Sequence, residues 1–139
     1  MDMTINQAQK TIADFLGYLY IPYTKVSETY KKPGWYAPTF PIEQYVGRSN
    51  KDLPFIFNYS SLVKVLQSLK VDNIHLCTFP NELAFMKFDE GIGATLFNSP
   101  FIPSNFLYKI CIGLANVIKN ENLEFHKERL ELSRRTLEI

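Results

Sequence analysis

Histidine and cysteine are scarce in this chain of 139 residues, which has two of each. His75 and His126 stand alone, without the clustered ligands that a metal ion requires, so no metal site is expected. Cys77 and Cys111 lie in apolar stretches, where free thiols behave as small hydrophobic side chains. No Cys/His pattern accompanies them, so core filling is favoured over a disulfide or a nucleophile.

The chain also lacks an excess of charge of either sign, since its formal net charge is +1. Up to residue 70 it has 8 basic and 5 acidic residues, and after residue 70 it has 7 and 9. General nucleic-acid binding through neutralised phosphates is therefore not expected. A local site for an anion stays open.

No apolar run approaches the roughly 20 residues that a membrane-spanning helix needs. The N-terminus, MDMTINQAQK, lacks the basic start and the apolar centre of a signal peptide. The sequence therefore predicts a cytoplasmic protein without membrane attachment.

Catalytic signatures are missing as well. The Gly91-x-Gly93 pair lacks the further glycine or lysine of a phosphate loop, and with Asp89 and Glu90 it predicts a turn. General acid/base chemistry usually needs two titratable groups that converge in a cleft. The chain offers only Asp52, that acidic pair and two isolated histidines, so we expect neither an enzyme nor a cofactor.

Apolar residues return at helical spacing in three stretches. The pattern Thr4-Ile5-Asn6-Gln7 fits a capping box and predicts a helix that ends near Gly17 and presents Gln9, Lys10 and Asp14 to water.

The other two helices have caps of their own. Asn58 and Ser60 are cap candidates for a second helix, which reaches Leu69. Ser104 can cap a third, which stops near Asn120 and contains Gly113, a residue that predicts close backbone packing.

The β-formers predict short strands between turn residues. They are expected around Leu19–Val26, Trp35–Phe40, Leu53–Phe57, Ile74–Phe79, Leu83–Phe88 and Ala94–Phe97. The last three form an antiparallel meander. The fold class is therefore α+β, a mainly antiparallel sheet flanked by helices, as one domain over residues 1–120 with an aromatic-rich insertion at 18–52.

Residues 121–139 are charged and helical in composition. Leu123, Leu130 and Leu137 repeat every seven residues, and so do Phe125, Leu132 and Ile139. Positions two apart on a helix point about 200° from each other, so these are opposed apolar stripes. One stripe would pack on its own domain and the other on a second subunit, which predicts a homo-oligomer, whereas the alternative is a solvated tail.

Several short segments resemble small proteins encoded by phages and prophages of Bacteroidetes-type bacteria. They are Ile12-Ala13-Asp14-Phe15-Leu16-Gly17, Lys32-Pro33-Gly34-Trp35, and Asp52-Leu53-Pro54-Phe55 leading through Asn58-Tyr59-Ser60 to Leu62-Val63-Lys64-Val65-Leu66. Over about residues 4–119 the chain is similar to the phage ABA-sandwich family, and this resemblance implies an ABA-sandwich-like layering. Where the family often has an acidic residue and a tryptophan, this chain has Ser61, Leu62 and Val63.

The order of elements is also similar to that of phage anti-defence proteins that sequester cyclic ADP-ribose-type signals. The resemblance implies a non-enzymatic phage accessory protein that binds a small nucleotide-like ligand. The aromatic segment allows two interpretations, rings packed on the core or a stacking platform. The ligand-binding candidates are Trp35, Tyr36 and Tyr59 for stacking, Arg48, Lys51 and Lys109 for phosphate, and helix amides at Ser60 and Ser104. The alternative function is a structural or protein-interaction module.

Overall fold

A computed structural model describes residues 3–37, 44–49 and 59–123. The helices are α1 (Ile5–Phe15), α2 (Tyr59–Ser68) and α3 (Phe106–Asn120), with short 3-10 helices η1 (Tyr23–Lys25), η3 (Leu69–Asp72) and η4 (Pro103–Asn105). The strands are β1 (Leu19–Ile21), β2 (Gly34–Ala37), β3 (Gln44–Gly47), β4 (Ile74–Phe79), β5 (Glu82–Asp89) and β6 (Ile92–Pro100). The predicted α+β class is confirmed.

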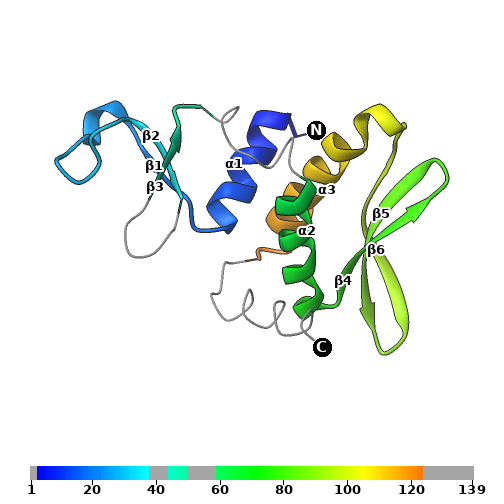
Figure 1. The fold of residues 1–139 in the computed structure, drawn as a ribbon. Coiled ribbons are helices and arrows are strands. Elements are labelled where there is room, and N and C mark those ends of the chain that lie inside the picture. The colour runs from blue at the N-terminus through cyan, green and yellow to red at the C-terminus, as the bar shows by residue number, and fades with distance from the viewer. Residues whose placement is uncertain (1–2, 38–43, 50–58, 124–139) are drawn as a thin grey trace.

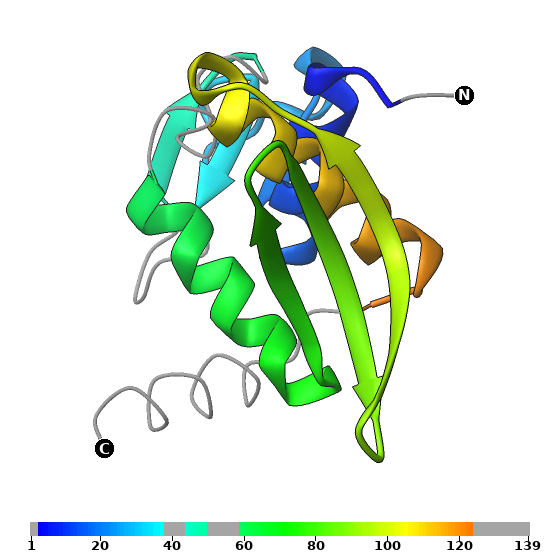
Figure 2. The same ribbon diagram turned by 90° about the vertical axis from the view of Figure 1, so that its right-hand side faces the viewer.

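The strands form two antiparallel sheets, sheet A with the order β1-β2-β3 and sheet B with the order β4-β5-β6. Figures 1 and 2 show α3, with α2 beside it, behind sheet B, and α1 between these helices and sheet A. The described helices thus lie between two sheets, whereas the sequence predicts one main sheet with helices outside it. The strands of sheet A pair locally, and α1 separates them from sheet B.

Helix α1 begins and ends as the sequence predicts. The Thr4 hydroxyl accepts from the Gln7 backbone N–H at 3.2 Å, and Gln7 Oε1 accepts from the Thr4 N–H at 2.9 Å, which completes the capping box. At the other end Gly17 has a φ of +84°, and the Tyr18 N–H donates to the Ala13 carbonyl at 2.9 Å. This Schellman ending satisfies a carbonyl that the helix leaves without a partner.

One side chain of α1 contradicts its prediction. Gln9 was expected to face water, yet it is fully buried, and neither its Nε2 nor its Oε1 has a hydrogen-bond partner. Ala13 lies four positions after Gln9, on the same side of α1, and is buried as well. The buried stripe of α1 is therefore wider than the apolar residues alone indicate. A buried amide without partners costs about 1–3 kcal/mol.

Replacing Gln9 by methionine, which has nearly the same shape, is therefore expected to raise the free energy of unfolding by about 1 kcal/mol. Urea denaturation followed by circular dichroism measures this change. Lys10→Met, at the exposed neighbouring position, is the control and should give no such gain. A Gln9→Met protein no more stable than the wild type would show that the amide is satisfied in solution.

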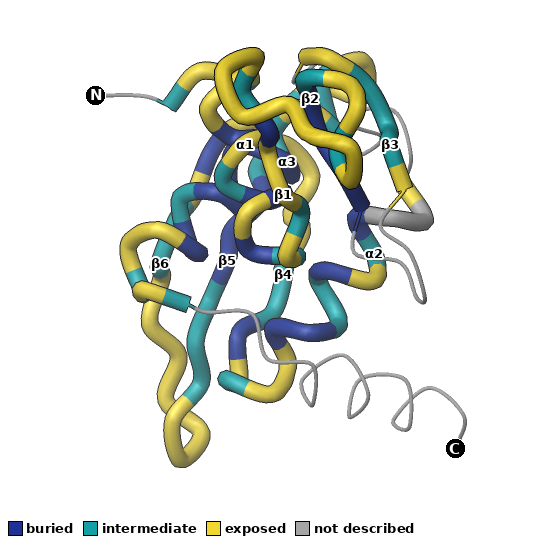
Figure 3. Tube along the Cα trace, turned by 90° about the vertical axis from the view of Figure 1, so that its left-hand side faces the viewer, coloured by how far each residue is buried: buried dark blue, intermediate teal, exposed yellow. Residues whose placement is uncertain are grey.

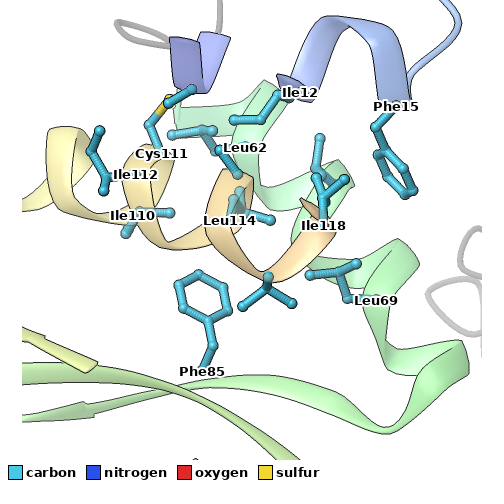
Figure 4. Close-up of a cluster of buried hydrophobic side chains, with 14 of the residues drawn as sticks. Ile12, Phe15, Leu62, Leu69, Phe85, Ile110, Cys111, Ile112, Leu114 and Ile118 are labelled. Carbon is cyan, nitrogen blue, oxygen red and sulfur yellow. The ribbon is translucent and has the colours of Figure 1, made fainter. Parts of the chain in front are cut away.

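Helix α3 forms the centre of the core. Figure 4 shows Ile12 of α1 approaching it from one side and Phe85 of β5 from the other. A Cβ on Gly113 would overlap the Phe85 ring and lie 2.9 Å from Cδ1 of Phe97. The close packing predicted for Gly113 is confirmed. The buried residues of α3 are Ile110, Cys111, Ile112, Gly113, Leu114, Ala115, Val117 and Ile118.

The predicted meander at residues 74–97 is confirmed: β4 has the predicted bounds, β5 extends one residue further at each end, and β6 is more than twice as long as expected. Its second turn is Glu90-Gly91, where both residues have positive φ, +51° and +84°. The turn is thus a two-residue hairpin turn, shorter than the turn over Asp89–Gly93 that the sequence predicts, because β6 already begins at Ile92. The register shifts between Phe85 and Met86, where Leu96 of β6 is the extra residue of a β-bulge.

Other boundaries differ from the predictions. The strand predicted over Leu19–Val26 ends at Ile21, because Pro22 is followed by the 3-10 turn η1. Strand β3 was not predicted. The strand expected at Leu53–Phe57 lies outside the described residues, as does the C-terminal segment beyond residue 123, so the two-stripe helix stays a prediction.

Candidate functional site

Trp35 lies in β2 and is only 1% exposed. It belongs to the same core cluster as Ala8 and Ile12 of α1, and the ring of Tyr20 on β1 lies against it with centroids 5.2 Å apart. Of the two interpretations left open, packing on the core describes Trp35. No planar ligand can stack directly on its ring in this structure.

Tyr36 points to the other face of sheet A and is 6% exposed. Its hydroxyl donates to the Lys32 carbonyl at 2.8 Å and accepts from the Lys32 N–H at 3.2 Å. The rings of Tyr30 and Tyr45 meet it edge-on at 5.0 and 5.4 Å. The chain before β2 thus covers this face, and Tyr36 is a packing residue rather than an open platform.

Two of the other candidates are exposed near sheet A. Arg48 follows β3 directly and is exposed, and Tyr59, the first residue of α2, is 51% exposed. Ser60 lies inside the first turn of α2, so it is not the N-cap residue that the sequence predicts. Lys51 lies outside the described residues.

The two remaining candidates lie at the start of α3. Ser104 is exposed in η4, and the N-cap of α3 is Asn105, so the predicted cap at Ser104 is wrong. The Asn105 side chain instead accepts a hydrogen bond from the Ile102 N–H at 2.9 Å, because the chain makes a 3-10 turn first. Figure 1 places the start of α3 and sheet A on opposite sides of α1, so Ser104 and Lys109 do not converge with Trp35, Tyr36 and Arg48.

Two solvent-exposed tyrosine rings lie on or beside sheet A, in the same aromatic-rich segment as the predicted stacking residues. Tyr20 is 48% exposed and rests on the buried Trp35, and Tyr23 in η1 is 83% exposed. Figure 3 views this side of the molecule, where exposed chain surrounds the buried strand β2. Trp35 therefore packs beside the Tyr20 ring, and the rest of the Tyr20 ring is exposed to solvent.

Charge around sheet A is mostly positive. The described residues 18–37 and 44–49 contain four basic side chains, Lys25, Lys31, Lys32 and Arg48, against the single acidic Glu28. The Lys32 ammonium stands 5.3 Å from the Tyr45 ring centroid, a cation–π distance. Residues 74–123 instead contain three basic and four acidic side chains. The near-neutral chain is thus divided along its sequence, and the basic part is the segment that also contains Tyr20 and Tyr23.

A pocket of about 460 Å³ with a mixed polar and apolar lining lies where the last turns of α1 and α3 meet. Its lining includes Thr11, Asp14, Lys119 and Asn122. Burial raises the pKa of the Asp14 carboxyl above its usual value, and Lys10 offsets part of that rise. Two helix C-termini and a carboxylate disfavour an anion, so this pocket does not suit a phosphate.

No described group of three or more His, Cys, Asp or Glu side chains is arranged to hold a metal ion. Among the described helices, none has the length and apolar character that crossing a bilayer would require. Comparison of the chain with protein-family models, curated proteins and solved structures finds no match. The resemblance to phage proteins thus stays a prediction, and function is argued from the residues themselves.

Sequence reasoning missed Tyr20 and Tyr23 as site residues. Both lie in the aromatic segment that the sequence singles out, but nothing local separates an exposed ring from a buried one. The signal is positional: Tyr20 alternates with Ile21, which is buried at 7%, and Tyr23 follows Pro22 in a turn. Strand alternation therefore marks Tyr20 as facing away from Ile21 once β1 is known.

Proposed function

We propose that this chain is a non-enzymatic binding protein that holds a small nucleotide-like ligand over sheet A. One observation carries the proposal: the half-exposed Tyr20 ring packs beside the buried Trp35, in a part of the chain where basic side chains outnumber acidic ones. A planar base would stack on Tyr20, an interaction that contributes about 1–3 kcal/mol. Arg48 would meet the phosphate.

Sequestration, not turnover, fits the groups around sheet A. The described residues 18–37 and 44–49 contain no histidine, cysteine or aspartate and a single glutamate, Glu28, so this part of the chain offers no imidazole and no pair of carboxylates for general acid/base chemistry. Together with the resemblance to phage-encoded proteins, this supports an anti-defence accessory protein that withdraws a signalling nucleotide from the host. Arg48 is exposed, so its contribution would weaken as salt screens it.

Matched substitutions at Tyr20 test the stacking role. Tyr20→Phe keeps the ring, whereas Tyr20→Leu keeps apolar cover on Trp35 and removes the ring. Each protein is incubated with a nucleotide extract, washed and heated, and the released small molecules are quantified by chromatography. The wild type and Tyr20→Phe are expected to release a stoichiometric ligand, and Tyr20→Leu roughly tenfold less, which is about 1.4 kcal/mol. Equal release from all three would refute stacking on Tyr20.

The alternative function, a structural or protein-interaction module, is favoured by a different surface. Cys77, Met86 and Phe88 stand half-exposed on the face of sheet B that points away from α3. Exposed apolar patches of this kind mark contact surfaces for other proteins. A stoichiometric protein captured by the wild type and lost in Met86→Lys would support this function, while capture that is indifferent to Met86→Lys would exclude this face.

A further inference from the structure

The register of sheet B assigns its side chains to two faces. Opposite residues in an antiparallel pair share a face, so Leu83 and Phe85, which pack in the core, define the inner one. The outer face then consists of His75, Cys77 and Phe79 on β4, Glu82, Ala84, Met86 and Phe88 on β5, and Gly93, Thr95, Asn98 and Pro100 on β6.

No described element covers the outer face. Figure 2 looks onto sheet B, and α2 and α3 lie behind it. An antiparallel sheet with one solvated face normally alternates apolar and polar residues, whereas the runs IHLCTF and LAFMKF in β4 and β5 are apolar at most positions on both faces. The pattern of these two strands is therefore that of a sheet packed on both sides.

The outer face is uneven, because some cross-strand rows hold small, buried side chains (low rows) and others hold larger, more exposed ones (high rows). Ala84 lies between Cys77 and Asn98 and is 5% exposed, so this row is low. Phe88 lies further along β5 on the same face and is half-exposed. A Cβ added to Gly93 would lie 2.9 Å from Phe88 Cε1. His75 meets Phe88 edge-on, with ring centroids 5.7 Å apart. Rows of this kind interdigitate when two sheets stack about 10 Å apart.

The charges of the outer face suit a second copy of the same surface. Glu82 is its single carboxylate, stands at one end, and accepts a hydrogen bond from Asn98 Nδ2 at 2.8 Å. The face has no lysine or arginine. Two identical faces would therefore meet without like charges at their centre, and a net charge of +1 sets little long-range repulsion between two copies.

The area of the face bounds the strength of such a contact. Strands of six, eight and nine residues that lie about 4.8 Å apart give an outline of roughly 14 by 26 Å, or roughly 360 Å² from each copy. The total lies below the roughly 1,200 Å² of a standard stable interface. A contact of this size is weak and depends on concentration.

We propose that a second copy of this chain packs its outer face on this one, so that two sheets B form the middle of a symmetric dimer. The inference rests on the alternative function given above, a protein-interaction module. It is independent of the C-terminal stripes, and it is separate from ligand binding on sheet A.

Sedimentation velocity over a roughly hundredfold range of concentration tests the dimer. The wild type is expected to shift from monomer toward dimer, and Met86→Lys, which places a charge at the centre of the contact twice, should weaken dimerisation at least tenfold. Tyr23→Lys, at an 83% exposed position in η1, is the control and should dimerise like the wild type. A wild type that stays monomeric, or a Met86→Lys protein that dimerises normally, would overturn the inference.

Thiol labelling of the wild type gives a second readout that needs no variant. Cys77 is half-exposed on the outer face, so its alkylation should slow as the protein is concentrated. Cys111 is the internal reference, because it is fully buried and burial raises the pKa of its thiol to about 12. Cys77 labelling that ignores concentration would count against the dimer, and capture of a different protein through the same face would then leave only the alternative function standing.

Discussion

Gly34→Ala is expected to disrupt sheet A and to lower the free energy of unfolding by about 3 kcal/mol or more. Gly34 has a φ of +139°, which L-residues rarely adopt. A Cβ there would overlap the Gly47 carbonyl oxygen and lie 3.0 Å from Arg48 Cα. Both obstacles are backbone atoms, so β2 and β3 would have to separate.

The single tryptophan reports this change directly. Trp35 is adjacent to Gly34 and 1% exposed, so its emission should shift to the red when sheet A loosens. Gly91→Ala is the matched control, since Gly91 also has a positive φ, of +84°, but nothing lies within 4 Å of the added Cβ. It should cost only the strain of the dihedral angle, about 1–2 kcal/mol. A Gly34→Ala protein with wild-type emission and stability would refute the β2–β3 pairing.

Gly113→Ala is expected to destabilise the protein by about 1–3 kcal/mol, although alanine favours a helix by about 1 kcal/mol over glycine. The added methyl group meets the rings of Phe85 and Phe97, both held between α3 and sheet B. The helical gain is therefore smaller than the cost of overpacking. Urea denaturation compares the two proteins.

A double-mutant cycle identifies the cause of that loss. Phe85→Leu shortens the side chain that Gly113→Ala would strike, so the double variant should be more stable than the sum of the two single changes indicates, by at least about 0.5 kcal/mol. Additive effects would mean that Gly113 does not contact Phe85.

The two glycines also show how far sequence reasoning reaches. Gly113 interrupts an apolar stripe that is otherwise regular, so the sequence itself indicates that something must come close to the helix there. Gly34 appears in the sequence only as part of a Lys32-Pro33-Gly34 turn. Its need for glycine arises from Gly47, which is 13 positions away and belongs to a strand, β3, that local patterns do not predict.

The candidate site was hard to predict for a related reason. Trp35 and Tyr36 are neighbours and face opposite sides of sheet A, and each side is covered by a different element, α1 for Trp35 and the chain around Tyr30 for Tyr36. Composition indicates aromatic packing but not which rings remain open. In contrast, the meander and the cap of α1 depend on residues at most a few positions apart, and these were predicted.

Titration calorimetry with cyclic dinucleotides and cyclic ADP-ribose isomers measures the proposed ligand binding over sheet A. Binding to the wild type is expected to weaken as salt rises and to fall at least tenfold in Arg48→Gln. Val71→Ser, at a 46% exposed position in η3, should bind like the wild type. No binding of any of these ligands at millimolar concentration, or equal binding by the wild type and Arg48→Gln, would contradict ligand binding over sheet A.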